Sequence, residues 1–166
     1  MQIIGKNQRQ YIKVFFFRII MNLFPAYRRT GGRVTFISND WCHVRIKLKL
    51  NWQTKNYVGS IFGGSIYGSI DPIYMLQLIK ILGPNYVVWD KEAAIKFIKP
   101  VRTTIYADFL LDQEIINKVK NEVQSKSKSI ISLPVNFYDA NNILYATISK
   151  TLYIADKKYY FNKRQS

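Results

Sequence analysis

The chain of 166 residues carries 25 Lys and Arg against 10 Asp and Glu, a formal net charge of +15, and 48% of its residues are hydrophobic. This length and composition suit one folded domain with a substantial core, and they exclude a disordered or low-complexity chain. The positive charge favours an anionic partner, although many basic residues alternate with apolar ones, as on the solvated face of a strand.

The N-terminal part contains an apolar stretch, YIKVFFFRIIMNLF, over residues 11–24. Because this stretch is short for a membrane span and contains Lys13 and Arg18, we predict an amphipathic helix that packs on the domain, without stable membrane insertion. Attachment to a membrane surface is the second interpretation. The basic end of the chain, KKYYFNKRQS, is typical of a flexible flank. The expected organisation is an N-terminal amphipathic helical segment over 1–24, a single domain over 25–156 and a basic C-terminal tail over 157–166.

Two strands are predicted next, RVTFISND over 33–40 and HVRIKLKLNW over 43–52, joined by a turn at Asn39-Asp40. Apolar and polar residues alternate strictly in the second strand, which is typical of a half-buried strand. Its expected core-facing residues are Val44, Ile46, Leu48, Leu50 and Trp52. His43 lies on the opposite face from Cys42, so we expect a solvated histidine and no Cys–His dyad.

The single cysteine, Cys42, leaves no intramolecular disulfide and no cysteine-based metal site. This favours a reducing compartment, and we expect a cytoplasmic protein. Because the chain also lacks any recognised spacing of metal ligands, we expect neither a metal nor a cofactor.

The stretch NYVGSIFGGSIYGSIDPIYMLQLIKIL, over 56–82, contains one carboxylate, Asp71, in apolar surroundings. Its glycines, at 59, 63, 64 and 68, match neither a phosphate-binding loop nor a dinucleotide fingerprint. From residue 72 to residue 82 the stretch is apolar nearly all round, which predicts a buried helix that ends at Gly83-Pro84. Asp71 is either the N-cap of that helix, with Pro72 at its first position, or lies about two turns inside a helix that begins near Gly63.

The second half of the chain is predicted to be mainly extended. Strands are expected over 85–100, 103–111, 129–139 and 143–155, and a polar helix over 112–126. Asp90 and Glu92 are expected to share one solvated or salt-bridged face of their strand. A buried helix among half-solvated antiparallel strands is most simply covered by a sheet curled around it. We therefore predict an α+β hotdog fold, in which an antiparallel β-sheet wraps a long central helix.

A longer motif in the glycine-rich stretch resembles a family signature. The pattern N-x-x-G-x-x-F-G-G-x-x-x-x-x-x-D is similar to the N-x-x-G-x-x-H-G-G-x-x-x-x-x-x-D signature of PaaI-type hotdog thioesterases, with Phe62 where the signature has histidine. Its fixed positions are Asn56, Gly59, Phe62, Gly63, Gly64 and Asp71. The segments RVTFISNDW, VVWDKEAAIKFIKP and TLYIA look like the DUF4442 branch of that superfamily, and the resemblance extends from about Leu23 to about Ile154.

The resemblance implies hydrolysis of an acyl-CoA thioester. Asp71 would be the general base or the nucleophile, the N–H of Gly64 would bind the oxyanion, and Asn56 would orient the water or the thioester oxygen. The residues expected around the substrate are Gly63, Phe62, Tyr57, Tyr67 and Ser65. The aromatic side chains favour a fatty or aryl acyl group. The site would be shared by the two subunits of a homodimer, and a dimer of dimers is left open.

Other functions are also considered for this chain. The alternative is a non-catalytic hotdog protein that binds an acyl chain or acyl-CoA, with Asp71 capping the helix or binding a polar ligand group. Dehydration is disfavoured, because the only histidine, His43, lies in a strand. Nucleic-acid binding is not expected, because aromatic residues fall mostly on the apolar faces of strands and no recognised motif is present.

Overall fold

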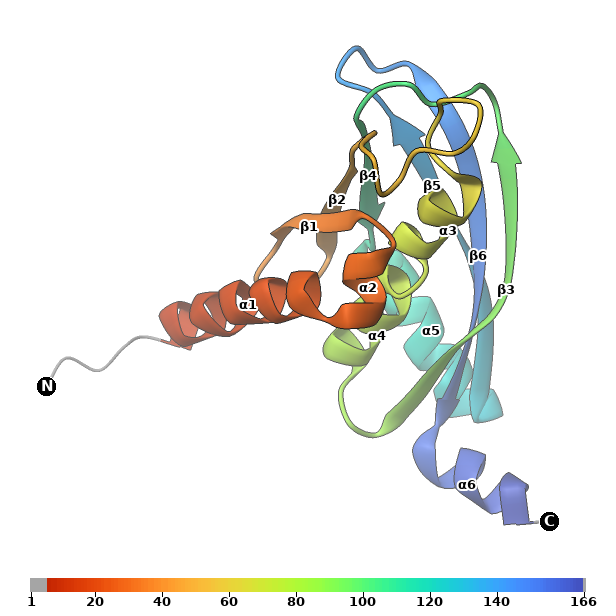
Figure 1. Cartoon of the computed structure of the whole chain (residues 1–166). Helices are drawn as coiled ribbons and strands as arrows, with labels where there is room; N and C mark the ends of the chain where they lie inside the picture. The colour runs from red at the N-terminus through yellow and green to blue at the C-terminus, as the bar shows by residue number, and fades with distance from the viewer. Residues whose placement is uncertain (1–5, 166) are drawn as a thin grey trace, which may run out of the picture.

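The computed structural model describes residues 6–165, in which six antiparallel strands form one sheet that curves around a central helix (Figure 1). The strands are β1 (Gly32–Ile37), β2 (His43–Leu48), β3 (Tyr86–Phe97), β4 (Ile105–Leu110), β5 (Lys128–Tyr138) and β6 (Leu144–Asp156). Their order across the sheet is β1-β2-β4-β5-β6-β3, and neighbouring strands run antiparallel. The hotdog prediction is confirmed.

Three of the six helices that the structure describes lie between strands in the chain, two precede the first strand and one follows the last strand. They are α1 (Lys6–Leu23), α2 (Pro25–Arg29), α3 (Gly63–Ile70), α4 (Ile73–Leu82), α5 (Gln113–Lys126) and α6 (Lys157–Gln165). Together α3 and α4 form the central helix. The C-terminal segment predicted to be a flexible flank instead forms α6, which packs against β6 and β3. Within residues 6–165, no helix combines the length and the apolar character needed to cross a membrane.

The second strand is shorter than its alternating pattern predicts. β2 ends at Leu48, four residues before the expected end at Trp52. The strand stops because the Asn51 side chain accepts a hydrogen bond from the N–H of Thr54 (3.1 Å), and the Thr54 hydroxyl donates to the carbonyl of Lys49 (2.6 Å), which closes a turn. Trp52 is consequently 85% exposed in the following loop, and its predicted place in the core is wrong.

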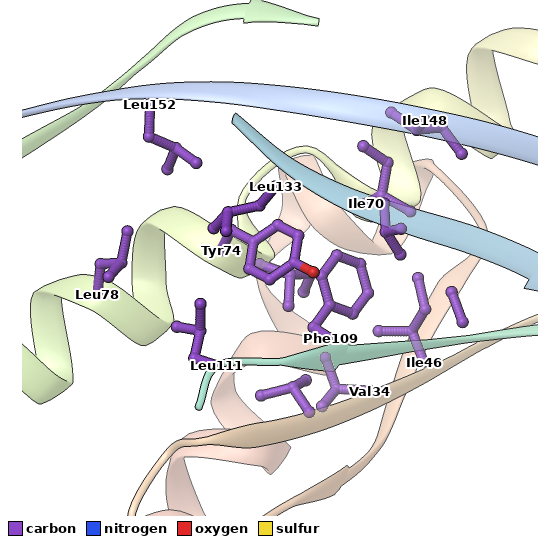
Figure 2. Close-up of a cluster of buried hydrophobic side chains, with 14 of the residues drawn as sticks. Val34, Ile46, Ile70, Tyr74, Leu78, Phe109, Leu111, Leu133, Ile148 and Leu152 are labelled. Atoms are coloured by element: carbon purple, nitrogen blue, oxygen red, sulfur yellow. The ribbon is translucent and has the colours of Figure 1, made fainter. Parts of the chain in front are cut away.

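The core lies between the concave face of the sheet and the central helix (Figure 2). Ile70, Tyr74 and Leu78 of the central helix are buried there. The ring of Tyr74 packs edge-on against that of Phe109 of β4, with centroids 4.9 Å apart, and its hydroxyl donates to the carbonyl of Pro134 (2.7 Å). These contacts fix the rotation of the central helix relative to the sheet.

The side of α4 that faces away from the sheet is less covered than predicted. Met75 and Leu76 are partly buried, and Ile79 is exposed. The expected burial of this helix nearly all round is therefore correct only for its sheet side. The partly open side faces α1 and α2 across a cavity.

The two outer strands of the sheet differ in what covers their free edges. α1 lies along β1, and Asn22 pairs with the backbone of Val34: its Nδ2 donates to the carbonyl (2.9 Å) and its Oδ1 accepts from the N–H (2.8 Å). Arg18 donates to the carbonyl of Thr35 (2.7 Å). β3, at the opposite end, pairs with β6 on one side and with no strand of residues 6–165 on the other. The sheet therefore offers unpaired backbone groups mainly along β3.

Candidate functional site

The central helix is interrupted at Asp71-Pro72, between α3 and α4. Both residues keep right-handed helical dihedral angles, and the N–H of Asp71 donates to the carbonyl of Tyr67 (3.1 Å), as in a continuous helix. Pro72 has no N–H for the carbonyl of Gly68, which accounts for the interruption. Asp71 thus lies about two turns after Gly63, and the first turn of α4 has no side-chain cap. The N-cap interpretation of Asp71 is wrong.

A buried lysine is the partner of Asp71. Lys150 lies on β6 at a position that faces the core, and its side chain is 1% exposed. Its Nζ lies 2.8 Å from Oδ1 of Asp71 and 3.1 Å from Oδ1 of Asp90 on β3. The first contact is a hydrogen bond, whereas the second is an ion pair without hydrogen-bond alignment. Such partners are needed because an unpaired buried ammonium group is costly.

The two carboxylates keep Lys150 charged. Burial lowers the pKa of Lys150, but the hydrogen bond to Asp71 and the charge of Asp90 outweigh this effect, so the pKa lies above its ordinary value. Burial raises the pKa of Asp90, against the opposing effect of Lys150. When all three groups are ionised they carry one net negative charge.

A β-bulge at Lys91 places Asp90 and Glu92 on opposite faces of the sheet. In the pairing of β3 with β6, Asp90 lies opposite Leu152 and Glu92 lies opposite Thr151, which leaves Lys91 as an extra residue. Asp90 is therefore partly buried on the inner side of the sheet, whereas Glu92 is exposed. The prediction that Asp90 and Glu92 share one face is wrong, because it assumed an unbroken alternation along the strand.

Tyr67 lies one turn before Asp71 on α3. The Nζ of Lys150 lies 5.4 Å from the centroid of the Tyr67 ring. Burial and the neighbouring Asp71 carboxylate raise the pKa of the Tyr67 hydroxyl, which therefore stays protonated at neutral pH. We call Asp71, Lys150, Asp90 and Tyr67 the lysine cluster. Among the residues predicted to surround the substrate, Tyr67 is the one that lies next to Asp71.

The side chain of Asp71 is 44% exposed and lines a cavity of about 480 Å³. This cavity, the Asp71 cavity, lies between the central helix and the two N-terminal helices. Its walls are mainly apolar and include Phe17, Ile20, Met21, Phe24, Met75 and Leu76. The volume falls within the range of small-molecule sites, and a single carboxylate in an apolar cavity is the arrangement expected of such a site.

Most of the other predicted site residues lie elsewhere. Asn56 and Gly63 line a second cavity, of about 400 Å³, beside the end of β3. The amide of Asn56 bonds Ser60 in its own loop, donating to Oγ (2.9 Å) and accepting from the N–H (3.0 Å). The remaining residues are Tyr57 and Phe62, which are exposed, and Ser65, which is buried in α3.

Gly64 belongs to the first turn of α3, where N–H groups have no acceptor inside the helix. It precedes Asp71 by seven residues, which corresponds to about 10 Å along the helix axis. The N–H of Gly64 and the carboxylate of Asp71 in the same chain are therefore too far apart to contact one carbonyl group.

A separate charged cluster lies on the outer face of the sheet, on β2 and β4. Asp108 accepts a hydrogen bond from Nε of Arg45 (2.7 Å) and lies 2.6 Å from Nε2 of His43. Burial raises the pKa of Asp108, but the hydrogen bonds from Arg45 and His43 outweigh this effect, and the pKa lies below its ordinary value. His43 is therefore part of a surface ion-pair cluster, in agreement with its predicted place on the polar face.

One family model matches the greater part of the sequence. The family model described as Domain of unknown function (DUF4442) matches residues 13–154, which is most of the chain. The chain belongs to the DUF4442 family. No curated protein matches it.

Several solved structures share the fold of this DUF4442 protein. A probable thioesterase of unknown function from Pseudomonas aeruginosa superimposes with a TM-score of 0.75 at 19% identity, over 86% of this chain and 95% of the other. For a thioesterase from Haemophilus influenzae the TM-score is 0.62 at 14% identity, over 86% and 90%. For thioesterase superfamily member 2 from Mus musculus it is 0.60 at 16% identity, over 85% and 96%. At these identities the likeness establishes the fold.

Lys150 is the member of the lysine cluster that the sequence analysis missed, although a signal for it exists. In ILYATISKTLYIA, residues Ile148, Leu152 and Ile154 are buried, and Lys150 has the same parity along the strand. A lysine on the apolar face of a strand predicts a buried cation, which in turn predicts carboxylate partners. Asp90 has the same parity as the buried Val88, but it could not be distinguished from Glu92, because the bulge at Lys91 is what places Glu92 on the other face.

Proposed function

We propose that this DUF4442 protein is a thioesterase that hydrolyses a fatty acyl-CoA thioester, with Asp71 as its catalytic carboxylate. One observation carries the proposal: an acidic side chain midway along the central helix lines an apolar cavity and is held by a buried lysine. The thioesterase names of structures with the same fold support the reaction class. The single cysteine supports a cytoplasmic location.

Two routes lead to the same products. In the general-base route, Asp71 takes a proton from water while the water oxygen attacks the thioester carbonyl carbon. The C–S bond then breaks, and the proton passes from Asp71 to the leaving thiolate. In the nucleophilic route, a carboxylate oxygen of Asp71 attacks the same carbon and expels the thiolate, and water then hydrolyses the resulting anhydride. In both routes Lys150 would hold the carboxylate in a fixed orientation.

The site is proposed to be complete only in a homodimer. Because Gly64 and Asp71 of one chain are about 10 Å apart along the helix, the oxyanion would be bound by Gly64 of the second chain. The free edge of β3, 12 residues long, supports a dimer in which the sheets join edge to edge. The partner would also cover the exposed Tyr57 and Phe62 and bring Asn56 to the shared site. A measured mass of two or four chains would distinguish a dimer from a dimer of dimers.

The acyl chain is proposed to occupy the Asp71 cavity. Phe17, Met21 and Met75 supply apolar contacts along the walls of the cavity. Asp71 lies on the wall that the central helix forms. Met side chains adapt to ligands of different shape. This placement favours a fatty acyl group over a rigid aryl group.

A non-catalytic acyl-CoA-binding protein is the second candidate function. Two observations favour it: Phe62 stands where the thioesterase signature has histidine, and Oδ1 of Asp71 is already engaged by Lys150. Such a protein would bind acyl-CoA saturably and release no thiol.

Release of free thiol from short, medium, long and aryl acyl-CoA thioesters tests the proposed reaction. Asp71→Asn is expected to lower kcat by about 100-fold or more, because a general base contributes that much to proton transfer. Glu114→Gln, at an exposed position of α5, is the control and is expected to retain wild-type activity. Equal rates for the wild type and Asp71→Asn would remove the catalytic role of Asp71.

Mixing two inactive variants tests whether the site is shared. Gly64→Pro removes the proposed oxyanion donor in the first helical turn, where proline costs no helical hydrogen bond, although its ring must displace the exposed side chain of Phe62. In a heterodimer of Gly64→Pro and Asp71→Asn chains, one shared site would carry both changes and the other would be intact, so activity returns. If each site used Gly64 and Asp71 of the same chain, every site would carry one defect and the mixture would stay inactive.

A further inference from the structure

The N-terminal segment has an unusual charge distribution. The first acidic residue of the chain is Asp40, and the preceding segment contains seven basic residues: Lys6, Arg9, Lys13, Arg18, Arg28, Arg29 and Arg33. α1 and α2 lie in this segment, and α1 projects from the body of the molecule in Figure 1. Because of this excess of basic residues, the N-terminal end of the molecule is attracted to negative charge over a long range.

α1 is apolar on two opposite sides, and the domain covers only one of them. Val14 and Met21 are buried on the inner side, where Arg18 and Asn22 bond β1. The outer side carries a continuous row of apolar side chains that are between 37% and 63% exposed. This outer face of α1 comprises Tyr11, Ile12, Phe15, Phe16, Ile19, Ile20 and Leu23, together with Phe24, which directly follows the helix. A soluble helix normally turns polar residues to this side, so an exposed apolar row of this length marks an interaction surface.

The charges around this face decide what kind of partner suits it. Lys13, Arg28 and Arg29 are exposed on α1 and α2, and Arg33 is exposed on β1. A second copy of the chain docked on the same face would bring two basic segments together without any acidic residue between them. An anionic lipid bilayer instead provides negative head groups for the basic side chains and an apolar layer for the aromatic ones.

We propose that the outer face of α1 docks reversibly on the surface of an anionic lipid bilayer. α1 lies in the plane of the interface with its apolar row among the acyl chains, and the basic residues contact the head groups. Ile20 and Phe24 belong both to this face and to the wall of the Asp71 cavity. The cavity therefore lies directly beside the lipid surface. The docking does not depend on the proposed hydrolysis, since it uses none of the residues of the lysine cluster.

Flotation of the full-length protein with lipid vesicles tests the proposal. Binding is expected to vesicles that contain phosphatidylglycerol, to weaken with rising salt, and to be at least about tenfold weaker with phosphatidylcholine alone. Phe16→Asp is expected to lower binding to the anionic vesicles by about tenfold or more, because it removes a large apolar contact and adds a repelled charge. Ile12→Asp, on the same face, provides a second variant and is expected to act in the same direction.

Phe161→Asp is the matched control. It makes the same change on α6, where Phe161 is also exposed in a basic segment, and it is expected to leave vesicle binding unchanged. No flotation with anionic vesicles, or loss of binding with Phe161→Asp but not with Phe16→Asp, would overturn the proposal. So would a sedimentation experiment without lipid in which Phe16→Asp dissociates an oligomer, since the outer face of α1 would then be an interface between copies of the chain.

Discussion

The ammonium group of Lys150 lies 2.8 Å from Oδ1 of Asp71, although the two residues are 79 positions apart in the chain. Lys150 comes from the sheet and Asp71 from the interruption of the central helix. The bond therefore ties the helix to the sheet at the point where Pro72 removes a backbone hydrogen bond. Because the second partner, Asp90, is also partly buried, removal of the lysine would leave two neighbouring carboxylates without a cation.

Lys150→Met is expected to destabilise the fold by about 2 to 3 kcal/mol at pH 7. Loss of one partner from a fully buried ion pair costs about 3 to 5 kcal/mol, and the value is lower here because Asp71 is partly exposed. Urea unfolding monitored by circular dichroism measures the change. Lys96→Met, the same substitution at an exposed position of β3, is expected to cost less than about 0.5 kcal/mol.

The pH dependence of the same variant gives a second check. The pKa of Lys150 is raised in the folded protein, so its contribution is complete below the unfolded-state pKa and is lost only as the pH rises through the folded-state pKa. Between pH 5 and pH 7 the wild type therefore keeps this stabilisation. In Lys150→Met the two carboxylates repel each other, and the deficit relative to the wild type should shrink as the pH falls and one of them is protonated. A deficit that grows toward pH 5 would contradict the assignment.

Asn22→Ala tests the cover over β1. The substitution removes two hydrogen bonds to Val34 and leaves that residue's N–H and carbonyl unpaired, at an expected cost of about 1 to 2 kcal/mol in the free energy of unfolding. Asn162→Ala, at an exposed position of α6, should change it by less than about 0.5 kcal/mol. Light scattering at high protein concentration should also rise for Asn22→Ala, because a second strand edge becomes accessible.

Asp108→Asn tests the ion-pair cluster on the outer face of the sheet. The folded-state pKa of Asp108 is depressed, so its contribution is present above the unfolded-state pKa and is lost as the pH falls through the folded-state pKa. We expect the variant to be less stable than the wild type by about 1 kcal/mol or less at pH 7, since the cluster is partly solvated. The two proteins should become equally stable in strong acid. Thermal unfolding as a function of pH distinguishes this from a pH-independent packing effect.

Ala26→Phe tests the proposed place of the acyl chain. Ala26 lines the Asp71 cavity from an exposed position, so a larger side chain can fill part of the cavity without crowding the core. KM for long-chain acyl-CoA is expected to rise several-fold, while short-chain substrates are little affected. Ala140→Phe, in the exposed turn before β6, is the control. A uniform change across all chain lengths would argue against the assignment of the cavity.

The sequence was sufficient for the fold because its main signals are local. The alternation in β2, the apolar run of α4 and the stop at Gly83 each follow from a short stretch of residues. The stop agrees with the structure, the alternation holds as far as Leu48, and the apolar run forms α4 but is buried only on its sheet side. Asp71 could be assigned only as one of two alternatives, since an Asp-Pro pair suits both the start of a helix and its interior. The family resemblance favoured the interior, and the backbone geometry agrees with it.

The site was harder to predict because it depends on where separate segments meet. Lys150 comes from a strand far from the central helix in the chain, and a single bulged residue separates Asp90 from Glu92 on the two faces of β3. Part of the wall of the Asp71 cavity likewise comes from α1 and α2, and the apolar residues of this segment were expected to pack on the domain or to attach to a membrane surface. The periodicity of apolar residues within one segment does not show which other segments it meets in the fold.

The cover over β1 also limits how far the sheet can grow. A sheet with two open edges can add copies at both ends without limit and form a fibre. Here Asn22 and Arg18 close the edge at β1, and within the described part of the chain only the edge at β3 is open. When a second copy pairs its β3 with the first, the open edges of both molecules are used. Edge-to-edge assembly is therefore self-terminating at two chains, and the same contacts that hold α1 in place guard the protein against polymerisation.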